Sequence, residues 1–274
     1  MSINEIQSGF AEINGAKIYY ETAGEGLPFV MIHAGVADCR QWNNEFAFFA
    51  ESCRVLRYDM HGFGRSEPVA GDFNLMSDLA ALLEDLKFTE ALVLMGCSMG
   101  GGLAMDFALA HPDKVMALIV VDSGPSGLEL DVPAPPKYKE AEQAFEAGDL
   151  ERVAELETQI WFDGEGRSPQ QVNQPMRKLL NEMDRIVLAN EARNLGKRLP
   201  NSPSLAFDRL GELKVPVLVI VGAHDTSYTL AAAEYMMENL PLVRKAVIED
   251  AAHLPNMDQP EEFQGIVNDF LNSL

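Results

Sequence analysis

The chain has 274 residues, 47% of them hydrophobic, and a formal net charge of −21. This composition predicts a folded protein with one large core and is too apolar for a disordered chain. An acidic excess of this size repels phosphate backbones and anionic lipid headgroups, which argues against nucleic acid and membrane surfaces as partners. We therefore expect a small-molecule partner.

The sequence lacks the features of a secreted or membrane-spanning chain. Its N-terminus has neither a basic start nor an apolar core of signal-peptide length, and no uninterrupted apolar run approaches the length of a membrane span. Cys39, Cys53 and Cys97 are an odd number without Cys-x-x-Cys spacing, which disfavours both a disulfide framework and a zinc site. We expect a cytoplasmic protein with reduced thiols, no bound metal and no cofactor.

The first predicted elements are a β-hairpin and a series of alternating strands and helices. Residues 10–13 and 17–20 flank an Asn-Gly pair, which readily takes the positive φ angles of a two-residue turn. Apolar strands are then predicted at 29–32, 54–58, 91–95, 115–121, 215–221 and 245–248, with helices at 41–50 and 75–86. Continuous apolar strands between helices indicate a parallel sheet that is covered on both faces.

The alternation of predicted strands and helices stops between Asp122 and Val215, where the sequence shows no strand pattern. A passage rich in proline and glycine leads into charge-rich segments, and helices are predicted at 138–147, 150–162 and 169–195. We predict a core formed by residues 1–124 and 206–274, and a helical cap formed by residues 125–205. The natural role of such a cap is that of a lid.

The pentapeptide Gly-Cys-Ser-Met-Gly at residues 96–100 follows the apolar run 91–95 and precedes a helix-like stretch. A serine nucleophile elbow requires this order of strand, turn and helix. Such a turn strains the backbone of the nucleophile and needs small residues two places to either side. Gly96 and Gly100 occupy those places, so we predict that Ser98 is a nucleophile.

A serine hydroxyl is a poor nucleophile near neutral pH, so it needs a histidine as general base and an acid that orients this histidine. Asp225 follows the strand at 215–221 and His253 follows the last strand, which places both at the carboxyl edge of the sheet. Asp122, at the end of the strand at 115–121, is the alternative acid. Each residue alone fits an ordinary loop or cap role, but their agreement with one geometry favours catalysis.

From Gly9 to Leu274 the chain resembles the α/β-hydrolase fold superfamily. His33-Ala34-Gly35-Val36 resembles its His-Gly oxyanion loop, residues 58–66 its Asp-x-x-Gly-x-Gly-x-Ser turn, and residues 253–260 its histidine segment. The resemblance implies an α/β fold with a mostly parallel eight-stranded sheet, flanking helices and a helical cap inserted after the sixth strand. The chain departs from the pattern at Ala34, where glycine is usual, and at His61, where arginine is common.

An oxyanion hole needs two donors aimed at the developing negative oxygen. By the elbow geometry, one donor is the backbone N–H of Met99. Aligning His33 with the superfamily's loop histidine makes the N–H of Gly35 the second donor. Val36 is the alternative if the alanine displaces the loop.

These residues predict a serine hydrolase that cleaves carboxylic esters or lactones of small to medium acyl groups through an acyl-enzyme. Within the superfamily, the pattern most resembles small carboxylesterases and 3-oxoadipate enol-lactonases. Trp161 and Phe162, at the end of a cap helix, are the predicted pocket residues. The same triad also suits a carbon–carbon bond hydrolase or a perhydrolase, and some members of the fold are ligand-responsive signalling proteins with very slow turnover.

Overall fold

In a computed structural model, which describes residues 6–274, the described backbone forms an eight-stranded sheet with the order β1-β2-β4-β3-β6-β7-β9-β10. The strands are β1 (Gln7–Ile13), β2 (Ala16–Ala23), β3 (Leu27–Ile32), β4 (Cys53–Tyr58), β6 (Leu92–Cys97), β7 (Val115–Val121), β9 (Val217–Gly222) and β10 (Val243–Ile248). β2 pairs antiparallel with β1 and β4, and the other neighbours are parallel. The predicted fold class, a mostly parallel α/β sheet with a helical insertion, is confirmed.

The predicted hairpin is formed by β1 and β2. Ile13 and Ala16 face each other across the turn, and Asn14 and Gly15 have φ angles of 48° and 85°. Positive φ at both central residues matches the right-handed twist of the flanking strands, which is why an Asn-Gly pair closes this turn.

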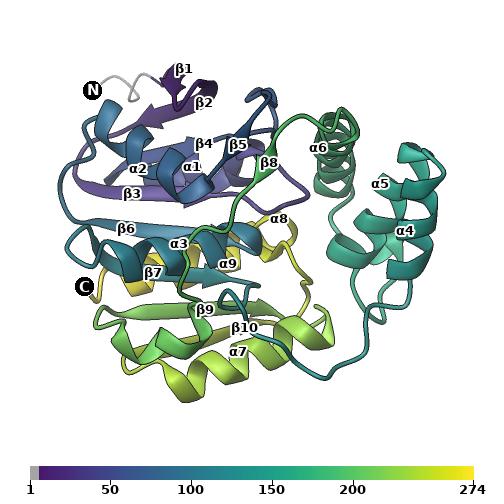
Figure 1. The fold of residues 1–274 in the computed structure, drawn as a ribbon. Coiled ribbons are helices and arrows are strands. Elements are labelled where there is room, and N and C mark those ends of the chain that lie inside the picture. Colours follow the sequence, from purple (N-terminus) through teal and green to yellow (C-terminus); the bar gives the residue numbers. More distant parts are fainter. Residues whose placement is uncertain (1–5) are drawn as a thin grey trace.

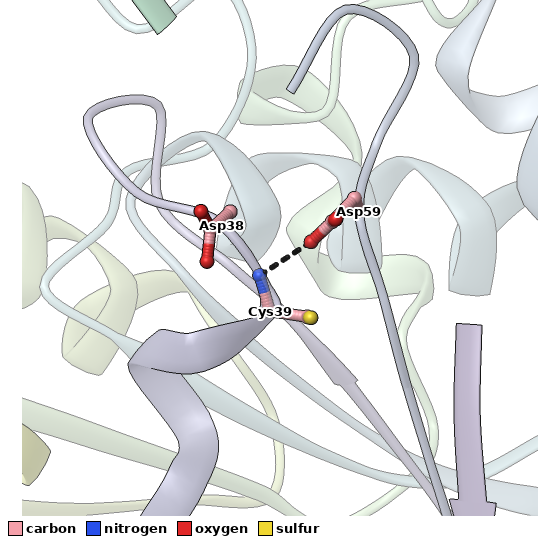
Figure 2. A group of neighbouring side chains, drawn as sticks. All are labelled: Asp38, Cys39 and Asp59. Atoms are coloured by element: carbon pink, nitrogen blue, oxygen red, sulfur yellow. Dashed lines mark hydrogen bonds between the residues drawn. The ribbon is translucent and has the colours of Figure 1, made fainter. Parts of the chain in front are cut away.

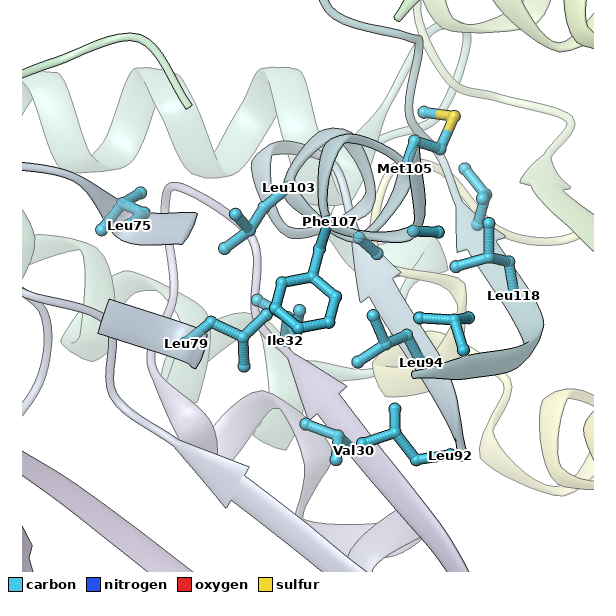
Figure 3. Packing of buried hydrophobic residues seen from close by; sticks show 14 of the residues in the cluster. Val30, Ile32, Leu75, Leu79, Leu92, Leu94, Leu103, Met105, Phe107 and Leu118 are labelled. Carbon is cyan, nitrogen blue, oxygen red and sulfur yellow. The ribbon is translucent and has the colours of Figure 1, made fainter. Parts of the chain in front are cut away.

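The central strands divide their side chains between two apolar layers. In β3, Val30 and Ile32 belong to one layer, whereas Phe29 and Met31 belong to the other. The first layer is covered by α2 (Leu75–Asp85), α3 (Met99–Ala110) and α7 (Ser227–Asn239), and the second by α1 (Asn43–Phe49) and α9 (Pro260–Leu271). Figure 3 shows Val30 and Ile32 on the side of the sheet that Phe107 of α3 covers. Burial on both faces explains the continuous apolar strands of the sequence.

Three helices lie beside the sheet in the segment between β7 and β9 (Figure 1): α4 (Tyr138–Glu146), α5 (Leu150–Thr158) and α6 (Gln174–Ala192). Two of the three predicted helices differ in detail. The helix expected at 150–162 changes after Thr158 into a π-helical turn, Gln159–Asp163, and the one expected at 169–195 begins only at Gln174, after a 3-10 turn at Pro169–Gln171. Further short helical elements are Cys39–Trp42, Phe207–Glu212 and α8 (Pro255–Asp258).

The segment between Asp122 and Val215 contains a strand that the sequence did not predict. β8 (Lys197–Arg198) pairs in parallel with β5 (Asp72–Phe73) in a separate two-stranded ladder. A strand of two residues is too short to show an alternating pattern in the sequence, so β8 can be identified only from its pairing with β5. The ladder ties the end of the helical segment to the loop that precedes α2.

The three cysteines are buried free thiols, as predicted. Among residues 6–274, none of the helices combines the length and the apolarity that crossing a membrane requires.

The turn between β6 and α3 has no room for side chains at its glycines. A Cβ atom on Gly96 would lie 2.2 Å from the carbonyl oxygen of Gly100, and a Cβ atom on Gly100 would lie 2.4 Å from that of Ile32. Because these neighbours are backbone atoms, they cannot give way by a rotamer change. The two glycines therefore set how closely α3 approaches the sheet.

We expect Gly100→Ala to lower the free energy of unfolding by more than about 3 kcal/mol, because backbone carbonyls of β3 would have to move. Gly102→Ala on the same helix is the matched control. Its Cβ atom would lie 3.6 Å from the oxygen of Gly124, an ordinary contact, and alanine favours a helix by about 0.5–1 kcal/mol. Urea unfolding of both variants measures the difference, and equal stabilities would contradict the close approach.

Candidate active site

A cavity of about 620 Å³ lies where the carboxyl ends of the central strands meet the helical segment. Ser98 and His253 line it from the core, and Tyr138, Trp161 and Arg198 line it from residues 125–205. Volumes of this size are typical of small-molecule sites. The structure thus brings the predicted nucleophile and the predicted base to one cavity.

Ser98 stands between the last residue of β6 and the first residue of α3, with φ 52° and ψ −117°. This combination is costly for a residue with a side chain and persists only where the surroundings impose it. Here the surrounding backbone holds it, since the N–H of Ser98 donates to Val121 and its carbonyl accepts from Gly101 and Gly102. The strain presents the side chain of Ser98 at the cavity wall.

His253 and Asp225 form a buried pair. The Nδ1 atom of His253 lies 2.7 Å from Oδ2 of Asp225, and Oδ1 of Asp225 accepts from the N–H of Thr226 at 2.6 Å. With Nδ1 engaged, Nε2 remains for a proton from the serine hydroxyl. Between Ser98 and His253 the described residues show no hydrogen bond, and such bonds often tighten only when substrate is bound.

Asp122 lies beside this pair, but in the described chain it forms no hydrogen bond with the ring of His253. Its Oδ1 atom accepts from the N–H of Gly222 at 3.0 Å, and its ligand atoms lie within 4.8 Å of those of Asp225 and His253. Burial and the neighbouring carboxylate of Asp225 raise the pKa of Asp122 well above its ordinary value. The surroundings of Asp122 therefore favour its protonated form, whereas Asp225 is the hydrogen-bond partner of the histidine.

The predicted oxyanion donors lie next to each other. A Cβ atom on Gly35 would lie 3.8 Å from the Cβ atom of Met99, and both residues line a second cavity of about 440 Å³ that adjoins the first. In the described chain, neither the N–H of Met99 nor those of Gly35 and Val36 donate to a protein acceptor. Free amides at a helix start and in a neighbouring loop are the groups that an oxyanion requires.

His33 holds the loop that carries Gly35. Its Nδ1 atom donates to the carbonyl of Ala34 at 2.7 Å, and its Nε2 atom accepts from the N–H of Met60 at 3.0 Å. Burial lowers the pKa of His33, so the ring stays neutral with one donor and one acceptor. The ring thereby joins this loop to the chain that leaves β4.

Asp38, Cys39 and Asp59 bring three possible metal ligands together (Figure 2). Their donors and acceptors already have protein partners, because Asp59 accepts from the N–H groups of Cys39 and Arg65, and Asp38 pairs with Arg40. Burial raises the pKa of the Cys39 thiol, which keeps it protonated and a poor ligand. We interpret this cluster as the support of the turn at residues 58–66.

Of the two predicted pocket residues, Trp161 lines the cavity and Phe162 does not. The centroids of the Trp161 and His253 rings lie 4.6 Å apart, whereas Phe162 is 1% exposed and packs in the second apolar layer. Successive residues of the π-helical turn point in different directions, so only one of two adjacent aromatic side chains reaches the cavity. The prediction for Phe162 is corrected accordingly.

The turn that carries Trp161 is bonded to both loops of the His253–Asp225 pair. The carbonyl of Trp161 accepts from the N–H of His253 at 3.1 Å, and the N–H of Glu165 donates to the carbonyl of His224 at 2.8 Å. Arg167 donates to the carbonyl of Asp250 at 2.6 Å and pairs with Asp258. The π-helical turn and the residues that follow it are therefore part of the site's framework.

Sequence reasoning missed Tyr138, Arg198 and Asn201 as cavity residues. Tyr138 opens a helix, and the other two lie in or beside the short strand β8, where no periodic pattern indicates a direction.

The sheet, the strained serine and the histidine–aspartate pair define an α/β hydrolase. The chain belongs to the alpha/beta hydrolase family, whose model matches residues 29–264. It is 30% identical to a pimeloyl-(acyl-carrier protein) methyl ester esterase from Aeromonas hydrophila, over 92% of this chain and 98% of the relative. It is 26% identical to a 2-hydroxy-6-oxononadienedioate/2-hydroxy-6-oxononatrienedioate hydrolase from Paraburkholderia xenovorans, over 97% of this chain and 93% of the relative.

The fold also matches the crystal structure of the enol-lactonase from Burkholderia xenovorans, with a TM-score of 0.77 and 23% identity over 96% of this chain and all of that one. The predicted resemblance to the α/β-hydrolase superfamily and its esterases is therefore confirmed, the enol-lactonase shares the fold, and the protein is an α/β-hydrolase enzyme.

We expect Asp225→Asn to reduce turnover of a 4-nitrophenyl ester by about 10³–10⁴-fold, because the amide favours the wrong tautomer of His253. Asp122→Asn should retain turnover within about tenfold, since an amide keeps the bond from Gly222 and, like the protonated form that burial favours, carries no charge. Steady-state kinetics of both variants make the comparison. The reverse order of effects would assign the acid to Asp122.

Glu45 belongs to a buried network that joins the oxyanion loop to the histidine segment. Gln41 accepts from the N–H of Ala34 at 2.8 Å, and the amide of Asn256 donates to the carbonyl of Gln41 at 2.9 Å and to Glu45 at 3.0 Å. Burial raises the pKa of Glu45 from 4.5 to about 7, despite these hydrogen bonds.

Because the folded state holds the Glu45 proton more tightly than the unfolded state, stability falls as the pH rises from about 4.5 through about 7. We expect this group to account for a loss of about 3 kcal/mol across that window, and Glu45→Gln to remove that part of the pH dependence. Urea unfolding at pH 5 and pH 8 gives the measurement, with the exposed Glu51→Gln as control. An unchanged pH dependence in Glu45→Gln would refute the assignment.

Proposed function

We propose that the protein hydrolyses carboxylic esters or lactones of small to medium acyl groups, with Ser98, His253 and Asp225 as its catalytic triad. The observation that carries this proposal is the strained Ser98 on the wall of a cavity that it shares with His253, whose Nδ1 atom is bonded to Asp225. The esterase relative at 30% identity supports it, because its name describes cleavage of a methyl ester.

The proposed reaction has two steps. Ser98 Oγ attacks the carbonyl carbon while Nε2 of His253 takes the hydroxyl proton, and the oxyanion is bound by the N–H groups of Met99 and Gly35. The tetrahedral intermediate collapses and expels the alcohol, which receives the proton from His253. Water then attacks the acyl-enzyme in the same way and releases the acid and the free serine.

The helical segment serves in this proposal as the lid of the site. Residues 125–205 would form the lid over a core of residues 1–124 and 206–274, because Tyr138, Trp161 and Arg198 supply one wall of the cavity. A volume of about 620 Å³ accommodates a small or medium acyl group. Trp161 would contact the substrate next to the histidine.

Carbon–carbon bond hydrolysis is the second candidate, because the name of the relative from Paraburkholderia xenovorans describes the hydrolysis of a dienedioate. The same serine, histidine and oxyanion donors would serve both reactions. A panel of esters, lactones and vinylogous ketones distinguishes the two by their relative kcat/KM values.

We expect turnover of 4-nitrophenyl acetate, butyrate and octanoate, with a preference for the shorter chains, and a loss of about 10⁴-fold or more in Ser98→Ala. Ser52→Ala, which removes an exposed hydroxyl outside the cavity, is the matched control. A fluorophosphonate that labels the wild type but not Ser98→Ala, as measured by protein mass, identifies the nucleophile independently of the substrate.

A folded Ser98→Ala protein with full activity would exclude this mechanism. Wild-type turnover below about one per hour, against a typical median near ten per second, would instead favour a ligand-responsive signalling role.

A further inference from the structure

Of the described residues that line the 620 Å³ cavity, Arg198 is the one lysine or arginine. Its guanidinium group contacts the Sδ atom of Met99, the residue that follows Ser98. Arg198 also lines the adjoining cavity that contains Gly35, so its charge lies where the two cavities meet. A full positive charge therefore stands close to the predicted nucleophile and oxyanion donors.

Among the described residues, this arginine has no carboxylate partner, in a chain that has 42 acidic and 21 basic residues. Within residues 6–274, every arginine except Arg54, Arg198 and Arg244 forms a salt bridge. Arg54 donates to backbone carbonyls and Arg244 to a serine hydroxyl. Arg198 alone has a thioether, a weak acceptor, as its partner.

The carboxylates of the cavity do not serve as its counter-ion. Asp106 accepts from the hydroxyl of Ser126 at 2.6 Å and from the amide of Asn201 at 2.9 Å, and Asp122 is buried against Gly222. Neither lies within salt-bridge distance of Arg198 in the described chain. The cavity thus presents an unneutralised guanidinium group to whatever enters it.

The backbone holds Arg198 in place. It belongs to β8, where it pairs with Phe73 of β5, and the N–H of the next residue, Leu199, donates to the carbonyl of Phe73 at 2.8 Å. A side chain that starts from a hydrogen-bonded strand is better positioned for recognition than one that starts from a free loop.

We propose that Arg198 binds a free carboxylate of the substrate, so that the preferred substrates are esters or lactones that also carry a carboxylate group. This inference rests on the proposed hydrolase function and specifies its substrate class. A planar guanidinium group binds a carboxylate through two parallel N–H···O bonds, which fixes orientation as well as charge. Because the chain's overall charge repels anions, selectivity for such substrates depends on this one cation.

The test compares charged and neutral substrates of equal length. Mono-4-nitrophenyl glutarate and 4-nitrophenyl pentanoate place the carboxylate on the acyl side, and 4-carboxyphenyl butyrate and phenyl butyrate place it on the alcohol side. In at least one pair, Arg198→Gln should lower the ratio of kcat/KM for the charged over the neutral substrate by about 10–100-fold, the usual range for a charge-assisted hydrogen bond. Lys197→Gln, the same loss of charge one residue earlier and outside both cavities, should leave the ratio within about twofold.

A binding measurement separates this inference from the proposed function. In calorimetry, the Ser98→Ala protein should bind monoethyl glutarate with an affinity at least about tenfold higher than that of the Ser98→Ala/Arg198→Gln protein. Ratios and affinities that do not depend on Arg198 would overturn the carboxylate site, even in an active esterase. Binding that depends on Arg198, in a protein that hydrolyses no ester, would uphold the site and refute the function.

Discussion

The rest of the site depends on the close contact between β6 and α3. Gly96 and Gly100 allow strand and helix to approach until their backbones touch, and this approach forces Ser98 into a conformation with φ 52°. The same contact brings the start of α3 against the end of β3, so the free N–H of Met99 and the loop of Gly35 become neighbours. One steric constraint therefore places the predicted nucleophile and both predicted oxyanion donors.

The remaining groups are held by buried polar networks rather than by apolar packing. Gln41 and Asn256 connect the loop after β3 to the histidine segment, more than two hundred residues away in the chain. Asp122 connects the end of β7 to the end of β9 through Gly222, beside Asp225. Such networks are directional, so they fix the orientation of loops whose apolar contacts would allow several.

The fold, and most residues of the candidate site, could be predicted from the sequence because their signals are local. Strands that are buried on both faces are continuous apolar runs, the Asn-Gly pair closes the hairpin, and the glycines around Ser98 predict the elbow. Arg198 and the correction at Phe162 could not be predicted in this way. A two-residue strand has no period of its own, and the direction of a side chain in a π-helical turn depends on the packing of the segment against the core.

The hydrogen bonds between the Trp161 turn and the two loops of the proposed triad affect how this enzyme can diverge and be engineered. Trp161 and Glu165 are bonded to the backbone beside His253 and Asp225, so the base of the helical segment cannot be exchanged without disturbing those loops. A chimaera that takes the whole segment from a relative would inherit foreign contacts at the reaction centre. The helices α4 and α5 lie farther from the sheet (Figure 1), so exchanging them should change the substrate range with less effect on the catalytic loops. A transplant bounded by Tyr138 and Thr158 would leave the Trp161 turn unchanged.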